Sequence, residues 1–203
     1  MDDHARRSIG ILLFDGAEEL DWAGPWEVLA AWAQVWPADG ARVFTVAPGP
    51  GLVTCAKGLR VMPDFEWSSA PSCDVAIVPG GRGTRALMGD AAMRAWLRDA
   101  FARQALVTSV CTGSLLIADA GLRDGRPATT HWGSLDQLAG LGQGIRVDRE
   151  ARFVDDGAIV TAAGVSAGID MALYLVGRLA SVDRAREVAR YIQYEQRAAF
   201  PPS

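Results

Sequence analysis

The amino-acid sequence predicts an α/β protein, a three-layer αβα sandwich with a mostly parallel central sheet. Apolar runs of strand length alternate with segments of helical periodicity along the chain. Several of these runs are apolar without interruption, which is typical of strands buried on both faces of a parallel sheet. With 203 residues, 50% of them hydrophobic, the chain can bury one substantial core, and we expect residues 1–203 to form a single domain.

The first elements follow from hydrophobic patterning. Residues 9–14 form an unbroken apolar run and predict the first strand. A helix is expected next, with Pro25 in its first turn and apolar residues at helical spacing behind it. Residues 42–47 predict a second strand, and residues 53–62 predict a short hairpin or an extended connection.

The remaining elements continue the alternation. We expect a strand over residues 74–78, a helix over 93–100, a strand over 106–110 and a helix over 113–120. A hairpin over 152–161 and two helices over 169–179 and 182–194 follow. The hairpin has the clearest turn signal, because Asp155-Asp156-Gly157 separates two runs of β-forming residues. It predicts an antiparallel edge late in the sheet.

Charge and composition exclude several kinds of partner. The net charge is −4 with acidic and basic residues interspersed, so the chain offers no basic stripe to nucleic acid. The N-terminal residues predict neither a signal peptide nor a membrane span. Only residues 195–203 follow the last expected helix, too few for a helix-turn-helix pair. We therefore expect a small-molecule partner, no nucleic acid and no membrane.

Cysteine and histidine content bears on compartment and metal binding. The three cysteines include no Cys-x-x-Cys pair, which predicts a reducing, cytoplasmic setting. Two histidines are too few for a multi-histidine zinc site, so we expect no metal. No dinucleotide fingerprint or phosphate loop is present, and no cofactor is expected.

Cys111 is the leading candidate for a catalytic residue. The apolar run before it breaks abruptly into small residues, Thr112-Gly113-Ser114, as the strand-to-helix turn of a nucleophile elbow does. Backbone N–H groups at the start of the following helix favour thiolate, which predicts a lowered pKa for the thiol. The alternative is a buried cysteine that acts as a small hydrophobic residue.

Two other predicted strand ends supply candidate groups, and such ends converge in an open α/β sheet. Asp21 either caps a helix or acts as a catalytic carboxyl group. Gly80 and Gly81 allow close approach of a ligand, and their N–H groups with that of Thr112 could form an oxyanion hole. The alternative is a tight turn. Thr112 either caps the elbow helix or directs its hydroxyl at substrate.

Other polar and aromatic residues are assigned mainly structural roles. His131 could pair with Cys111 to activate the thiol, but a hydrogen-bonded structural histidine is the preferred interpretation. Glu18 and Glu19 are expected to be solvated. The tryptophans are expected mostly in the core, although Trp22 and Trp132 neighbour candidate residues and could line a pocket.

Four motifs together carry a family resemblance. They are Gly16–Asp21, Pro79–Gly81, Ser109–Ser114 and Ala128–Trp132. With these motifs, nearly the whole chain resembles the ThiJ/PfpI superfamily, which is related to class I glutamine amidotransferases. Within that superfamily it is most similar to isocyanide (isonitrile) hydratases and to the amidotransferase-like sensor domains of AraC-type regulators.

The resemblance implies a flavodoxin-like sandwich, a homodimer, and a hydrogen bond between Cys111 and the carboxyl group of Asp21. The N–H groups of Gly81 and Thr112 match the oxyanion pocket of the family. Asp21 and Thr112 match the hydratases, whereas the glyoxalase and deglycase branch carries glutamate at the position of Asp21. Family proteases place histidine after the cysteine, so peptidase activity is disfavoured.

The resemblance thus predicts an enzyme, a hydro-lyase that converts organic isocyanides to N-substituted formamides. Cys111 would attack the terminal carbon to form a thioimidate, and Asp21 would move protons. Two alternatives stay open. One is a standalone small-molecule sensor of the AraC-regulator type, and the other is glyoxalase or deglycase chemistry.

Overall fold

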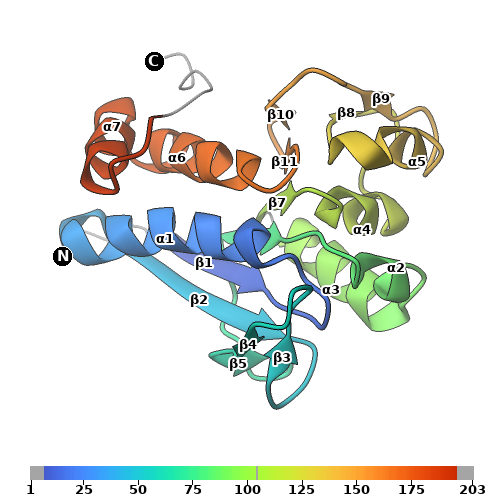
Figure 1. Cartoon of the computed structure of the whole chain (residues 1–203), viewed down its shortest axis with the longest axis horizontal. Coiled ribbons are helices and arrows are strands. Elements are labelled where there is room, and N and C mark those ends of the chain that lie inside the picture. The colour runs from blue at the N-terminus through green and yellow to red at the C-terminus, as the bar shows by residue number, and fades with distance from the viewer. Residues whose placement is uncertain (1–6, 104, 196–203) are drawn as a thin grey trace.

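A computed structural model of the chain describes residues 7–103 and 105–195 (Figure 1). The main sheet has seven strands in the order β10-β11-β7-β6-β1-β2-β5, and every neighbouring pair is parallel except the β10–β11 hairpin. In chain order these strands are β1 (Arg7–Leu12), β2 (Ala41–Ala47), β5 (Phe65–Glu66), β6 (Val75–Val78), β7 (Leu106–Val110), β10 (Phe153–Asp155) and β11 (Ile159–Ala162). The predicted parallel sheet with a late antiparallel edge is confirmed.

Helices cover both faces of this sheet. The helices are α1 (Glu19–Val35), α2 (Thr84–Leu87), α3 (Ala91–Ala102), α4 (Gly113–Asp119), α5 (Leu135–Ala139), α6 (Ala167–Leu179) and α7 (Val182–Tyr191). Helix α1 packs against α6 and α7 on one side of the sheet, while α3 and α4 pack together on the other (Figure 1). The three-layer αβα sandwich predicted from the sequence is therefore confirmed.

The core forms where the sequence has uninterrupted apolar runs. Ile9, Ile11 and Leu12 of β1 are completely buried, as is Ile77 of the neighbouring β6. Both strands lie in the interior of the sheet with helices on each face, so neither face needs polar residues. Along the described residues, no helix combines the length and the apolar character that crossing a membrane requires.

Two small sheets lie outside the main one. Strand β3 (Val53–Thr54) pairs antiparallel with β4 (Arg60–Val61), which is the short hairpin expected after β2. Strand β8 (Pro127–Ala128) pairs with β9 (Arg146–Val147), and this pair was not expected. The hairpin packs on the loop between β1 and α1, through backbone hydrogen bonds, and so becomes part of the framework of the candidate site.

Helix α1 begins earlier than predicted. Pro25 lies well inside the helix and not in its first turn, which instead holds Asp21. A proline inside a helix removes one backbone hydrogen bond. The extra turn before Pro25 carries Trp22, which is buried. The earlier start places Asp21 on the helix itself, facing the carboxyl ends of the strands.

Candidate active site

Cys111 lies at the turn from β7 into α4 and adopts a left-handed backbone conformation with φ of 55°. This region is uncommon for residues other than glycine. The N–H of Cys111 donates to the carbonyl oxygen of Ala163 at 2.8 Å, and the hydroxyl of Thr130 donates to the carbonyl oxygen of Cys111 at 2.8 Å. Neighbouring segments thus hold the strained turn predicted from the sequence. The Cys111 side chain is 7% exposed.

Asp21 brings a carboxyl group to this turn from helix α1. The side chain is fully buried, and its Oδ2 accepts a hydrogen bond from the N–H of Gly80 at 2.8 Å. The other oxygen, Oδ1, is buried, and no N–H or O–H group of the described residues donates to it. The thiol of Cys111 lies beside the carboxyl group. Capping is not the role of Asp21, because Glu18 occupies the N-cap position.

Burial controls the protonation of this pair. It raises the pKa of Asp21 from an ordinary 3.8 to about 7, and the negative charge of Glu18 adds to the increase. Burial also raises the pKa of the Cys111 thiol to about 12, and the charge of Asp21 again adds to it. The predicted low thiol pKa is therefore wrong, because desolvation and the adjacent carboxylate outweigh the helix N-terminus. Of the two groups Asp21 ionises first, as the pH rises through about 7, while the thiol of Cys111 stays protonated.

Two backbone N–H groups favour the thiolate, those of Thr112 and Val165, which hydrogen-bond to Cys111. Val165 follows β11 and has φ of 48°, an outlier for a β-branched residue. The sequence does not predict this contact of Val165, because any residue other than proline has a backbone N–H. A signal existed in the small-residue segment Gly164–Gly168, which follows a strand and opens a helix.

Gly80 and Gly81 form the close approach that the sequence predicts, but their N–H groups already have partners. That of Gly80 bonds Asp21, and that of Gly81 donates to Oγ1 of Thr112 at 3.0 Å. A Cβ atom on Gly80 would lie 2.4 Å from the nitrogen of Thr112. The two glycines therefore bring the three strand ends together. The Thr112 hydroxyl makes no capping bond to α4.

His131 makes local hydrogen bonds, in agreement with its structural interpretation. Its Nδ1 accepts from the N–H of Gly133 at 3.2 Å at the start of a 3-10 turn, Trp132–Ser134. The ring packs on Gly164, where an added Cβ would lie 2.5 Å from Cδ2 of the histidine. Trp132 is 80% exposed, whereas Trp22 is buried.

Glu18 and Glu19 are not solvated as expected. Both side chains are largely buried and pair with the ammonium group of Lys57 on the β3–β4 hairpin. The expectation failed because nothing in the local sequence shows that the hairpin folds over this loop. Within the described ranges, no group of three or more His, Cys, Asp or Glu side chains is arranged to hold a metal ion.

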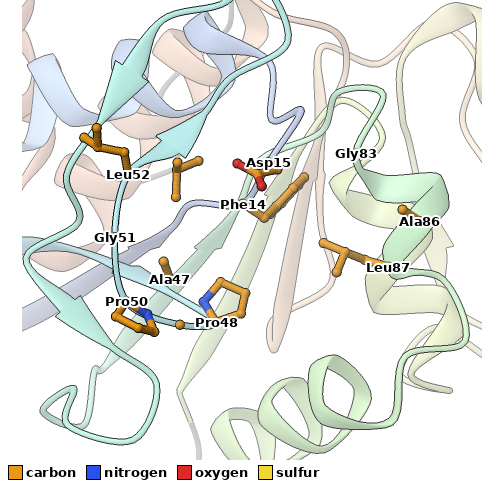
Figure 2. A pocket seen from close by; sticks show the side chains of 12 residues that line it. Phe14, Asp15, Ala47, Pro48, Pro50, Gly51, Leu52, Gly83, Ala86 and Leu87 are labelled. Carbon is orange, nitrogen blue, oxygen red and sulfur yellow. The ribbon is translucent and has the colours of Figure 1, made fainter.

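Two pockets lie beyond the carboxyl ends of the strands, and the first described here adjoins the site. One of about 380 Å³ is lined by residues that include His131, Trp132 and Val165, so it adjoins the N–H group that faces Cys111. The other, of about 300 Å³, is shown in Figure 2. There Phe14 and Asp15 lie between the segment that carries Leu52 and the segment of α2.

Comparisons with known proteins find relatives over nearly the whole chain. A sequence model of the DJ-1/PfpI family matches residues 7–178. A Pseudomonas putida protein named isonitrile hydratase is 40% identical over 194 residues, which are 96% of this chain and 80% of that protein. The Pseudomonas aeruginosa regulator GbdR, of the helix-turn-helix type, is 31% identical over 94% of this chain, which spans only 51% of the regulator. The crystal structure of a ThiJ/PfpI family protein from Pseudomonas syringae superposes with a TM-score of 0.84 and 34% identity, covering 98% of this chain and 78% of that one.

Proposed function

The chain belongs to the DJ-1/PfpI family, as its motifs predict, and we propose that it is an enzyme that hydrates organic isocyanides to N-substituted formamides. The observation that carries the proposal is the buried pair of Cys111 and Asp21, in which a nucleophile and a proton acceptor adjoin. The 40% identity to a protein named isonitrile hydratase supports the substrate class.

The first step forms a bond between sulfur and carbon. Because the thiol is protonated at neutral pH, its proton passes to Asp21 as Sγ of Cys111 attacks the terminal carbon of the isocyanide. Oδ1 of Asp21, to which no N–H or O–H group of the described residues donates, receives this proton. Asp21 then delivers the proton to the attacked carbon, which gives a neutral thioimidate, S–CH=N–R. The N–H groups of Thr112 and Val165 stabilise charge on sulfur as it develops.

The second step uses water. Asp21, again a carboxylate, accepts a proton from water as the oxygen adds to the thioimidate carbon, and it passes this proton to the substrate nitrogen. The C–S bond of the adduct then breaks, the hydroxyl proton returns to sulfur through Asp21, and the formamide leaves. One isocyanide and one water are consumed, and Cys111 is regenerated.

The pocket of about 380 Å³ next to Val165 is our proposed site for the substituent on the isocyanide nitrogen. Its volume is in the range of small-molecule sites. The exposed indole of Trp132 at this pocket offers an apolar face, and we propose that aryl substituents bind against it.

The test is an assay of the purified protein with para-nitrophenyl isocyanide, with the formamide measured by chromatography. We expect turnover by the wild type and none above background by Cys111→Ala. Methylglyoxal is assayed in parallel for lactate. Lactate without formamide, or a Cys111→Ala variant that keeps most of its hydratase activity, would refute the proposal.

A second candidate is a small-molecule sensor without fast turnover. The 31% identity to the regulator GbdR favours it. Calorimetric titration separates the candidates: saturable binding of an isocyanide with no formamide formed supports a sensor, and formamide formed with each turnover of Cys111 supports the enzyme.

A further inference from the structure

Lys57 is the single lysine of the chain, whose other basic side chains are arginines and two histidines. It lies between β3 and β4, and its side chain is 67% exposed. Its ammonium group pairs with Glu18 and lies 3.8 Å from Oε2 of Glu19. Glu18 is the N-cap residue of α1, just before the turn that carries Asp21. An exposed cation is thus linked to the buried carboxyl group through one glutamate.

The β3–β4 hairpin is hydrogen-bonded along the loop that precedes Asp21. Besides the Lys57–Glu18 pair, hydrogen bonds connect the two segments from Gly16 N to Thr54 O (2.8 Å), Ala56 N to Ala17 O (2.8 Å), Thr54 N to Asp15 Oδ1 (2.8 Å) and Lys57 N to Glu19 Oε1 (2.6 Å). The fully buried thiol of Cys55 lies beneath the hairpin against the indole of Trp22, the residue next to Asp21. The hairpin and the acid-bearing turn therefore form one bonded unit.

The charged and titratable groups that face Asp21 come from three elements. Glu18 lies at the start of its own helix, Lys57 lies on the hairpin, and Cys111 lies on the turn after β7. The charge of Glu18 raises the pKa of Asp21, and the charge of Lys57 lowers it. Because Lys57 and Glu18 form an ion pair, each offsets the field of the other at Asp21.

We propose that Lys57 is a positioning residue for the reaction: by pairing with Glu18 it holds the loop before α1 and balances the charge that the Asp21–Cys111 pair experiences. This inference rests on the proposed hydration chemistry, since it concerns the same pair. Lys57 itself lies outside the contacts to sulfur and acts only through Glu18 and the electrostatic field.

The main test compares Lys57→Met, which removes the charge, with Lys57→Arg, which keeps it. Arg60→Met, on β4 of the same hairpin, is the matched control for loss of a surface cation.

The reactive pair carries one negative charge, so kcat/KM rises with pH through the ionisation of Asp21. Without the ammonium group that rise moves to higher pH. At pH 6 we expect kcat/KM of Lys57→Met to fall about 2- to 4-fold, a shift of several tenths of a pH unit, with no change at pH 8.5.

Two further results are expected if the effect is electrostatic. The difference between Lys57→Met and the wild type shrinks in 1 M salt, because Lys57 is exposed to screening. Glu18→Gln removes the opposite charge and moves the rise to lower pH. Lys57→Arg and Arg60→Met keep the wild-type profile. A purely structural role for Lys57 would not produce shifts of opposite sign in Lys57→Met and Glu18→Gln.

A second readout is independent of turnover. The rate at which iodoacetamide alkylates Cys111, followed by peptide mass spectrometry, reports the same ionisation across pH. If Lys57→Met shifts this profile while the wild type forms no formamide, the inference holds and the proposed function fails. If the profiles of Lys57→Met, Glu18→Gln and the wild type coincide in both assays, the inference is overturned.

Discussion

Two turns meet at the candidate site, one at Cys111 and the other at Val165. They follow neighbouring parallel strands, β7 and β11, and both hold a non-glycine residue in the left-handed region, with φ of 55° and 48°. Cys111 contributes a side chain to the chemistry, whereas Val165 contributes only a backbone N–H. A side-chain role restricts residue type and is visible in sequence, but a backbone role restricts conformation alone.

The largest effect that tests this comparison is expected at Cys111. Cys111→Ser keeps the shape of the side chain but replaces the nucleophile, and we expect kcat/KM for isocyanide hydration to fall by about 10⁴-fold or more. The measurement is formamide release under steady-state conditions, with folding checked by circular dichroism. A loss of similar size on changing the side chain of Val165 would break the contrast between the two turns.

Asp21→Asn comes next in size. Asparagine can still accept the hydrogen bond from Gly80 but cannot move a proton, so we expect a loss of about 10²- to 10⁴-fold. The rise of kcat/KM near pH 7 disappears with the titrating group. A pH–rate profile checks both points, and an Asn variant that retains the same rise would assign it to another residue.

Asp21 also makes stability depend on pH. Its folded pKa of about 7 lies above the ordinary 3.8, so the folded protein keeps a proton that the unfolded chain releases. The stabilisation is complete below about pH 4 and is lost as pH rises through about 7. At about 1.4 kcal/mol per pKa unit, urea unfolding of the wild type and Asp21→Asn should diverge by up to roughly 4 kcal/mol across that window. Parallel pH dependences for the two proteins would contradict the raised pKa of the buried Asp21 carboxyl group.

The smallest effect is expected at Val165. Val165→Gly retains the N–H and relieves a strained φ, while glycine gains entropy in the unfolded chain. These opposing terms should leave the free energy of unfolding within about 1 kcal/mol of wild type, and the activity within about threefold. Urea unfolding and kcat/KM provide the measurements. A tenfold loss of activity would show that the valine side chain, and not only its N–H, serves the site.

Much of the fold could be predicted because long apolar runs and helical periodicity are local signals. Strands β1, β2, β6 and β7 appear in the sequence as short segments rich in hydrophobic residues. The missed elements, such as β5, α2 and α5, contain too few residues for a period to show. The start of α1 differs from the prediction because proline is favoured in a first helical turn, whereas the helix begins at Glu19 and buries Trp22 before Pro25.

The candidate site also has some features that the sequence predicts and others that depend on tertiary structure. Cys111, Asp21 and Thr112 were predicted, since their side chains carry chemical identity, and the structure brings them together. The thiol pKa was not predictable, because a sequence does not show how deeply a side chain is buried. The contacts of Val165 and Lys57 also escaped prediction, since each depends on a loop folding onto a distant segment.

Pro25 interrupts the backbone hydrogen bonding of helix α1. Proline has no N–H, so the carbonyl group of Asp21, one turn earlier, lacks its usual helical donor. The Asp21 side chain is held by the N–H of Gly80 in the loop after β6, so its placement does not depend on the helix alone. In the C-terminal part of α1, where Val28, Leu29 and Trp32 are buried, redesign at the exposed positions Gln34 and Val35 should leave the register of the carboxyl group undisturbed.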